Sequence, residues 1–311
     1  MVSQLIAGLW GTTQLQLFRI VDGRLADTRK GPGVAQVIGQ DFEALLLRLV
    51  EDWLERDCDT EVLLAGMVGS TIGWRETEYV RCPAPALKVM DRTASVSLGH
   101  RRAQILSGMA CINSLGEPDV LRGEEVELIG LEAMLSQSGA DRSLVCIPGT
   151  HTKWVMLKDS LVESFQSSVA GEIFAALTKS GVLAADHGDT FFRDVFVAAV
   201  GDAARDAAAL VHLLFSARSR VTSGKMDASH AADRLSGLLI GADVAGVLRS
   251  FALSPGNLPE VAVVAMPAIG KRYVVALEEF GFNARLVPSQ DAAVAGFLKV
   301  SESIGKGVAD A

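Results

Sequence analysis

Two adjacent glutamates and a nearby arginine are the residues with the clearest capacity for chemistry. Glu124 and Glu125 follow Arg122 and Gly123, and an apolar segment with helical spacing continues over 126–135. A carboxylate at a helix N-terminus could lie in a cleft and accept the proton of a hydroxyl during phosphoryl transfer. Both acids could instead be first-turn residues that the helix dipole favours. Arg122 could bind a carboxylate or a phosphate, or form an ordinary surface ion pair.

Two Gly-Thr sequences have residue types suited to binding phosphate. Gly11-Thr12-Thr13 and Gly149-Thr150 each follow a short apolar segment. Glycine lets backbone N–H groups approach phosphate oxygens, and the threonine hydroxyl adds a donor. Either sequence alone could be a plain hairpin turn. The chain has no GxxxxGK[ST] sequence and no GxGxxG after a strand, which argues against P-loop and dinucleotide-binding proteins.

The elements around the two Gly-Thr sequences follow one plan. The segment 5–10 reads as a buried strand and continues into alternating strands with a turn at Asp22-Gly23. Three strands over 144–147, 154–157 and 161–165 repeat this pattern. The repeat predicts two α/β halves of domain size, joined by the polar, turn-rich segment 136–142. Further predicted elements are a helix over 42–53, a strand over 61–65, a helix over 236–248, a strand over 260–265, a helix over 271–280, a strand over 284–288 and a final helix from about Asp291.

Longer stretches of the chain resemble the 2-dehydro-3-deoxygalactonokinases, a family of sugar-acid kinases. Similarity to this family extends in order over nearly the whole chain. The motifs that carry it are Ala65-Gly66-Met67-Val68-Gly69-Ser70 with Gly73-Trp74, Arg122-Gly123-Glu124-Glu125 with Ile129-Gly130, Pro148-Gly149-Thr150-His151 with Lys153-Trp154-Val155, Gly171-Glu172, and Ser236-Gly237-Leu238-Leu239-Ile240-Gly241-Ala242.

The resemblance implies a fold and an activity. It implies an α/β fold of two ribonuclease H-like domains, similar to the actin–hexokinase superfamily, with mixed sheets flanked by helices and a cleft between the domains. Residues 1–138 would bind the sugar acid and residues 139–311 the nucleotide, and the last helix could return to the first domain. The implied reaction is ATP-dependent phosphorylation of 2-dehydro-3-deoxy-D-galactonate at its 6-hydroxyl, with Mg2+, in galactonate catabolism.

The resemblance also implies site residues. Those expected to be catalytic are Glu124, Glu125 and Arg122. Those expected to bind nucleotide or phosphate are Gly11, Thr12, Thr13, Gly149, Thr150, His151, Lys153, Gly237 and Gly241. Those expected to bind the sugar acid are Gly66, Gly69, Ser70, Trp74 and Glu172. Alternatives remain for several of them, because Trp74 suits a core, Lys153 could face solvent, and Gly237 and Gly241 could only permit close helix packing.

Four features depart from the family pattern, mainly on the nucleotide side. The first strand of the family usually ends in an aspartate that organises Mg2+, and here the position is Leu9, which has no oxygen to bind a hard cation. Gln16 stands where the family has an arginine, and Ala170 where it has a hydroxyl residue. Met266-Pro267 replaces a glycine-rich turn expected to meet the adenosine. These losses raise a second hypothesis, a weak or inactive family member that acts as a sugar-acid sensor or regulator.

The composition excludes other classes of protein. The chain of 311 residues is 49% hydrophobic and 21% charged and has no apolar run of 18 residues, which argues against disorder and a membrane span. A net charge of −8 disfavours binding to nucleic acid or anionic membranes. With no basic cluster before the first apolar stretch, we expect a cytoplasmic protein whose partners are a sugar acid and a nucleotide, and which could form a homodimer. The cysteines lack the spacing of a disulfide framework or a zinc site, and are Cys58, Cys82, Cys111 and Cys146.

Overall fold

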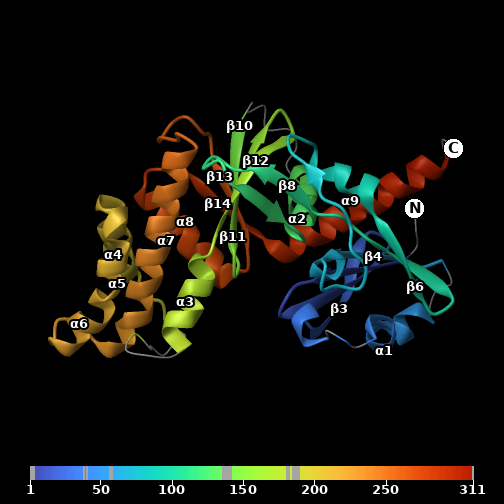
Figure 1. The fold of residues 1–311 in the computed structure, drawn as a ribbon, viewed down its shortest axis with the longest axis horizontal. Coiled ribbons are helices and arrows are strands. Elements are labelled where there is room, and N and C mark those ends of the chain that lie inside the picture. The colour runs from blue at the N-terminus through green and yellow to red at the C-terminus, as the bar shows by residue number, and fades with distance from the viewer. Residues whose placement is uncertain are drawn as a thin grey trace.

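The described strands form two large mixed sheets and one small sheet (Figure 1). A computed structural model describes residues 4–37, 39, 41–55, 59–134, 142–179, 183 and 190–309. The expected domain boundary at 138 and Cys58 lie outside these residues. The first sheet has the order β3-β2-β1-β4-β7-β6, with β1 Gln4–Trp10, β2 Gln14–Val21, β3 Arg24–Pro32, β4 Glu61–Gly66, β6 Ala94–Leu98 and β7 Arg101–Ile105. The second has the order β12-β11-β10-β13-β14, with β10 Arg142–Ile147, β11 Thr152–Lys158, β12 Leu161–Ser168, β13 Val261–Ala265 and β14 Ala284–Pro288.

The two large sheets share one strand plan. In the first, β1 pairs antiparallel with β2 and parallel with β4, and β2 pairs antiparallel with β3. In the second, β10 pairs antiparallel with β11 and parallel with β13, and β11 pairs antiparallel with β12. This confirms the predicted α/β class with mixed sheets flanked by helices. Because the parallel strands point the same way, the loops that follow them meet at one edge of each sheet.

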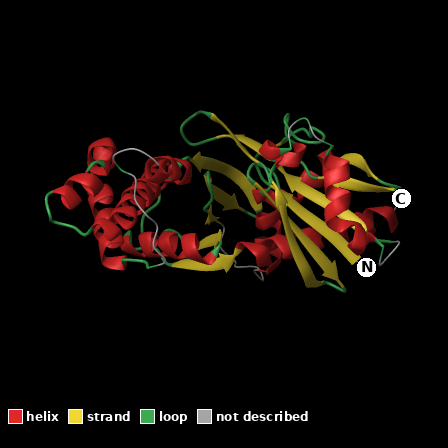
Figure 2. Ribbon diagram, turned by 90° about the horizontal axis from the view of Figure 1, so that it is seen from below, coloured by secondary structure: helices red, strands yellow, loops and turns green. Residues whose placement is uncertain are grey.

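The helices cover the outer faces of the sheets and fill the space between them. The helices are α1 Phe42–Leu54, α2 Glu124–Met134, α3 Ala170–Lys179, α4 Arg193–Arg205, α5 Leu210–Leu214, α6 Ser216–Thr222, α7 Ala231–Ser250, α8 Pro267–Glu279 and α9 Ser289–Ala309. Short 3-10 helices are η1 Val34–Gln36, η2 Met67–Gly69, η3 Ala86–Arg92, η4 Ala207–Ala209 and η5 Ala228–His230. Figure 2 shows that several helices gather at one end of the molecule, beyond the second sheet.

One hydrophobic core joins the two large sheets through α2 and α9. It contains Ala65 of β4, Val145 of β10 and Phe297 of α9, all buried. The helices α2 and α9 approach closely because Gly130 faces the backbone of Ala292, where no side chain would fit. The last helix of the chain therefore lies between the two sheets (Figure 1).

A small third sheet contacts the edge of the second sheet. Its strands are β5 Val80–Arg81, β8 Met109–Ile112 and β9 Pro118–Leu121, in the order β5-β8-β9. Asp119 of β9 accepts hydrogen bonds from the backbone N–H and the hydroxyl of Ser167 in β12, at 2.7 and 2.6 Å. The Arg122-Gly123-Glu124-Glu125 sequence follows β9 directly, so this contact holds its position relative to the second sheet.

The helix predicted over 271–280 begins earlier than expected. Met266 has an extended backbone and Pro267 is the first helical residue of α8. Proline suits this position because its fixed φ matches the helix and the missing N–H would have no intrahelical partner. Met266-Pro267 is therefore the start of a helix and not an open turn.

Candidate active site

Glu124 and Glu125 begin α2 and fold back on the turn before it. Gly123 has a φ of +110°, a conformation that favours glycine. The backbone N–H of Arg122 donates to Oε2 of Glu124 at 2.9 Å, and that of Gly123 donates to Oε2 of Glu125 at 2.6 Å. Both carboxylates are thus fixed at the helix N-terminus, where the dipole favours negative charge.

The acids of this turn differ in exposure. Glu125 is fully buried, and its Oε1 has no hydrogen-bond partner among the described residues. Burial, with a smaller contribution from the charge of Glu124, raises the pKa of Glu125 to about 8. Burial also raises the pKa of Glu127 well above its ordinary value, with Glu124 and Glu125 adding to the effect. Glu124 is only half-buried, so it is the acid of the three that a ligand can reach.

Gly66 and Gly69, two of the residues expected to bind the sugar acid, lie next to this turn. Gly66 has a φ of +96°, and a Cβ at Gly123 would lie 3.3 Å from its Cα. A Cβ at Gly69 would lie 2.7 Å from Nη1 of Arg122. The hydroxyl of Ser70 donates to the carbonyl of Met67 at 2.7 Å and so closes the η2 turn.

Trp74 packs toward the hydrophobic core of the first half. Its ring stacks on that of Phe42, with centroids 6.2 Å apart and an interplanar angle of 14°. It is partly buried there, as expected for a core residue. The structure therefore ties Trp74 to α1 more closely than to the turn of α2.

The first Gly-Thr loop lies at the same sheet edge as Gly66. The N–H of Gly11 donates to the carbonyl of Gln14 at 2.9 Å, and the carbonyls of Gly11 and Thr12 accept from η1 at 3.0 Å. Thr12 and Thr13 are exposed. A Cβ at Gly66 would lie 2.8 Å from the carbonyl oxygen of Trp10, the residue before this loop. The first loop, Gly66 and the Arg122 turn therefore lie side by side.

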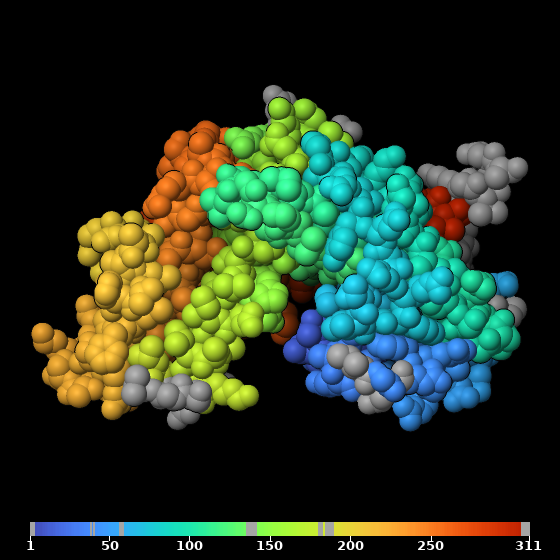
Figure 3. All heavy atoms as spheres, in the orientation of Figure 1, coloured from blue at the N-terminus to red at the C-terminus, as the bar shows by residue number. Residues whose placement is uncertain are grey.

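His151 and Glu172 lie within ion-pair distance of each other beside the second loop, Gly149-Thr150. Nε2 of His151 lies 2.8 Å from Oε2 of Glu172, and the N–H of Glu172 donates to the carbonyl of Thr150 at 3.0 Å. Gly171 faces the backbone of Gly149. Glu172, expected to bind the sugar acid, thus lies at the second loop. Figure 3 shows the surface hollowed between α3 (yellow-green), which carries Glu172, and the N-terminal segment (blue).

Lys153 faces the third sheet. It is buried, with 7% exposure, and its Nζ donates to the hydroxyl of Ser167 at 2.8 Å. Ser167 in turn binds Asp119, so the three side chains connect β11, β12 and β9. Lys153 therefore connects β11, the strand that follows the second loop, to β9, the strand that precedes Arg122.

A small cavity of about 140 Å³ opens beside Gly149, between α3, α7 and α8. The α7 residues that line it are Ser236, Leu239 and Ile240, which share one helix face at i, i+3 and i+4. Gly237 and Gly241 instead face α4, because Cβ atoms there would meet the backbone of Phe196 and Val200. The helical spacing of these three residues within the 236–242 motif could have shown, from the sequence, which face of α7 lines the cavity. The cavity residues outside the expected site residues are Ala170, Gly171, Phe174, Ser236, Leu239, Ile240, Ile269, Arg272 and Tyr273.

A polar network behind this cavity was not expected from the sequence. The hydroxyl of Tyr273 donates to Oδ2 of Asp243 at 2.9 Å and lies 2.8 Å from the hydroxyl of Thr152. Nε1 of Trp154 donates to Oδ1 of Asp243 at 3.1 Å. Burial raises the pKa of Asp243 to about 6, although its hydrogen bonds oppose this effect. The network fixes the start of β11 against α7 and α8.

The comparisons with known proteins decide the family. The family model described as 2-keto-3-deoxy-galactonokinase matches residues 10–300.

The chain belongs to this family.

Curated relatives agree with the family match. The chain is 33% identical over 95% of its length to the "Probable 2-dehydro-3-deoxygalactonokinase DgoK1" of Rhizobium meliloti (strain 1021), also covering 95% of that protein. It is 28% identical over 98% of its length to the 2-dehydro-3-deoxygalactonokinase of Escherichia coli (strain K12), covering 99% of that protein.

A solved structure agrees in fold. The crystal structure of "a putative 2-dehydro-3-deoxygalactonokinase protein from Sinorhizobium meliloti" superposes with a TM-score of 0.85 at 31% identity, covering 96% of each chain. The resemblance found in the motifs is thereby confirmed, and this galactonokinase-family member is a carbohydrate kinase.

The part of the kinase that the structure describes offers no preformed metal site. The described residues contain no group of three or more His, Cys, Asp or Glu side chains arranged to hold a metal ion. Leu9 and Gln16 are direct partners across β1 and β2 and contribute no carboxylate. Mg2+ therefore does not fit a site made by these side chains alone. No helix among the described residues is both long and apolar enough to span a membrane.

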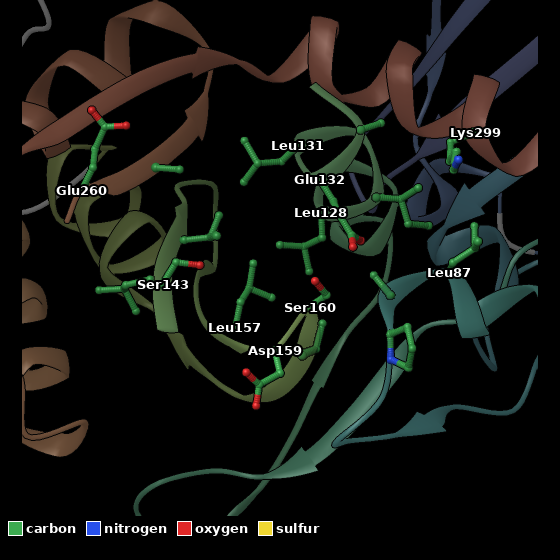
Figure 4. Close-up of a pocket in the computed structure, with 18 of the residues that line it drawn as sticks. Leu87, Leu128, Leu131, Glu132, Ser143, Leu157, Asp159, Ser160, Glu260 and Lys299 are labelled. Atoms are coloured by element: carbon green, nitrogen blue, oxygen red, sulfur yellow. The ribbon is translucent and has the colours of Figure 1, made fainter. Parts of the chain in front are cut away.

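A second, larger cavity lies away from the two loops. It has a volume of about 770 Å³ and is lined by the C-terminal part of α2, the β11–β12 turn and the first residues of β10 and β13 (Figure 4). Gly149 follows the opposite end of β10. Leu128, Leu131 and Leu157 form apolar walls of this cavity.

Proposed function

We propose that this kinase transfers the γ-phosphoryl group of ATP to the 6-hydroxyl of 2-dehydro-3-deoxy-D-galactonate. The observation that carries the proposal is the turn at the start of α2, where one half-buried glutamate stands beside two buried glutamates with raised pKa values. The family match and the names of the relatives support the choice of substrate.

Glu124 is proposed as the proton acceptor. The oxygen of the 6-hydroxyl forms a bond to the γ-phosphorus, the bond to the bridging oxygen of ADP breaks, and the hydroxyl proton passes to the carboxylate of Glu124. Its neighbour Glu125 keeps a proton at neutral pH because burial raises its pKa to about 8. A neutral Glu125 adds less negative charge close to the incoming phosphate than an ionised one would.

The two Gly-Thr loops are proposed to hold the phosphate groups of ATP. Exposed backbone and hydroxyl groups of Thr12, Thr13 and Thr150 are of the right type. The cavity between α3, α7 and α8 is proposed to receive the nucleoside, so nucleotide binding falls in the second half of the chain and sugar-acid binding in the first. Mg2+ is proposed to arrive with the phosphates of ATP, since the side chains present do not form a site for it.

The test is the identity of the product. Purified protein is incubated with ATP, MgCl2 and 2-dehydro-3-deoxy-D-galactonate, and the product is followed by phosphorus and proton NMR. We expect a phosphate monoester whose phosphorus couples to the protons on C6, and none with Glu124→Gln. A monoester at another carbon would overturn the assignment of the hydroxyl.

A sugar-acid sensor is the second candidate. The observation that favours it concerns Leu9 and Gln16, which pair directly across β1 and β2 beside the first loop. Because these two residues stand where the family has an aspartate and an arginine, this place lacks both the expected carboxylate and the expected cation. Calorimetry separates the candidates. Binding of the sugar acid without binding of ATP and without turnover would support the sensor and contradict the kinase proposal.

A further inference from the structure

Arg122 is held by two residues that the family motifs do not include. Its Nη1 donates to Oγ1 of Thr77 at 2.5 Å and its Nη2 donates to the Thr77 carbonyl at 3.0 Å. Its Nε donates to the hydroxyl of Tyr79 at 3.4 Å, and its guanidinium carbon lies 4.3 Å from the centre of the Tyr79 ring. A planar cation stacked on an aromatic ring and bonded along its edges has little freedom to rotate.

Two glycines make room for this arrangement. A Cβ at Gly69 would lie 2.7 Å from Nη1 of Arg122 and 2.9 Å from Oγ1 of Thr77. A Cβ at Gly108 would lie 3.0 Å from Cε1 of Tyr79. Any other residue at either position would push the tyrosine ring or the guanidinium out of place. We call Thr77, Tyr79 and Arg122 the arginine clamp.

The cation of the clamp forms no direct ion pair with a described carboxylate, although its charge opposes the rise in the pKa of the buried Glu125. None of the described carboxylates lies within ion-pair distance of the Arg122 guanidinium, although Glu124, Glu125 and Glu127 follow it within five residues. A guanidinium has five N–H groups, and the three hydrogen bonds above use three of them. Each terminal nitrogen therefore keeps one N–H group without a partner among the described residues. A half-buried, immobilised cation of this kind is suited to an anionic ligand.

We propose that Thr77 and Tyr79 position Arg122 to bind the C1 carboxylate of the sugar acid, and that this clamp makes the kinase select sugar acids over neutral sugars. The proposal rests on the proposed function. The carboxylate is favoured over the phosphates of ATP because the clamp packs on Gly69, whereas Gly149, Thr150 and the nucleoside cavity belong to the second sheet. The first Gly-Thr loop is the phosphate loop nearer to the clamp, and KM for ATP tests whether Arg122 contacts phosphate instead. Thr77 and Tyr79 are positioning residues, since they act through Arg122.

The test compares the sugar acid with its uncharged C1 carboxamide. Thr77→Val removes one acceptor but keeps the side-chain shape, and Tyr79→Leu removes the stacked ring. We expect each variant to raise KM for the acid by about tenfold, because an ordered charge-assisted contact is lost. KM for ATP and KM for the carboxamide are expected to stay within about twofold. Thr222→Val in α6 and Arg285→Met in β14, which lie in the second half of the chain, serve as controls.

Two results would overturn the clamp. One is an equal rise in KM for acid and carboxamide, which would mean a structural role. The other is a rise in KM for ATP with no change for the acid, which would mean a phosphate contact. Calorimetric dissociation constants for acid and carboxamide separate this proposal from the proposed function. If wild type has no turnover but binds the acid more tightly than the carboxamide, and Thr77→Val removes that preference, the clamp stands and the kinase proposal fails.

Discussion

At the scale of single residues, the buried Glu125 at the start of α2 has a raised pKa. Glu125 keeps its proton in the folded state up to a pKa of about 8, whereas in the unfolded chain its pKa is near the ordinary value of 4.5. Between these values the unfolded state loses the proton and the folded state retains it, so the free energy of unfolding falls as pH rises. Below about pH 4.5 both states are protonated and the effect disappears.

We therefore predict that Glu125→Gln weakens the pH dependence of stability. The free energy of unfolding is measured with urea from pH 5 to 8.5. The value for the variant relative to wild type should rise by up to about 1.4 kcal/mol per pH unit. The comparison with wild type removes the contributions of Glu127 and Asp243, whose raised pKa values act in the same direction. Parallel profiles for the two proteins would mean that Glu125 is ionised in the folded state.

Leu9 gives a second prediction at this scale. It is half-buried at the end of β1, two residues before Gly11, and pairs with Gln16. Replacing it with aspartate would supply an oxygen ligand for the Mg2+ that accompanies ATP. We predict that Leu9→Asp raises turnover about tenfold at limiting MgCl2 relative to Leu9→Asn, which loses the same packing but adds no charge. Equal rates in both variants across a MgCl2 titration would show that the metal does not depend on this position.

At the scale of elements, the packing of α7 on α4 sets the role of the α7 glycines. Cβ atoms at Gly237 and Gly241 would meet α4, whereas a Cβ at Gly246 of the same helix would meet nothing within 4 Å. We predict that Gly237→Ala lowers stability by about 1–3 kcal/mol through overpacking. Gly246→Ala should be neutral or stabilise by up to about 1 kcal/mol, because alanine favours helices. Thermal unfolding measures both, and an unchanged melting temperature with a higher KM for ATP in Gly237→Ala would point to a nucleotide contact instead.

The elements also show what sequence can predict. The strand, hairpin and helix patterns followed from local alternation and turn residues such as Asp22-Gly23, and the duplicated plan followed from their recurrence. The start of α8 was predicted too late, because proline is common both in loops and at the first position of a helix. Thr77, Tyr79 and Asp243 carried no local signal, since their roles depend on partners such as Arg122 and Trp154 that lie far along the chain.

At the scale of the whole molecule, the shared core makes the two halves depend on each other. Phe297 of α9 is fully buried in the cluster that contains residues of both large sheets. We predict that Phe297→Ala lowers the free energy of global unfolding by about 3–5 kcal/mol. Hydrogen exchange should show equal loss of protection in β4 and β10, and loss confined to one sheet would mean that the halves unfold separately.

The most direct test of the kinase is sugar-acid-dependent release of ADP. Purified wild type and Glu124→Gln are incubated with ATP, MgCl2 and 2-dehydro-3-deoxy-D-galactonate, and ADP is measured with and without the sugar acid. We predict release that requires the sugar acid in wild type and falls at least about 100-fold in Glu124→Gln, while both proteins bind ATP and sugar acid equally. Wild type that binds the sugar acid but releases no ADP in response to it would contradict the kinase.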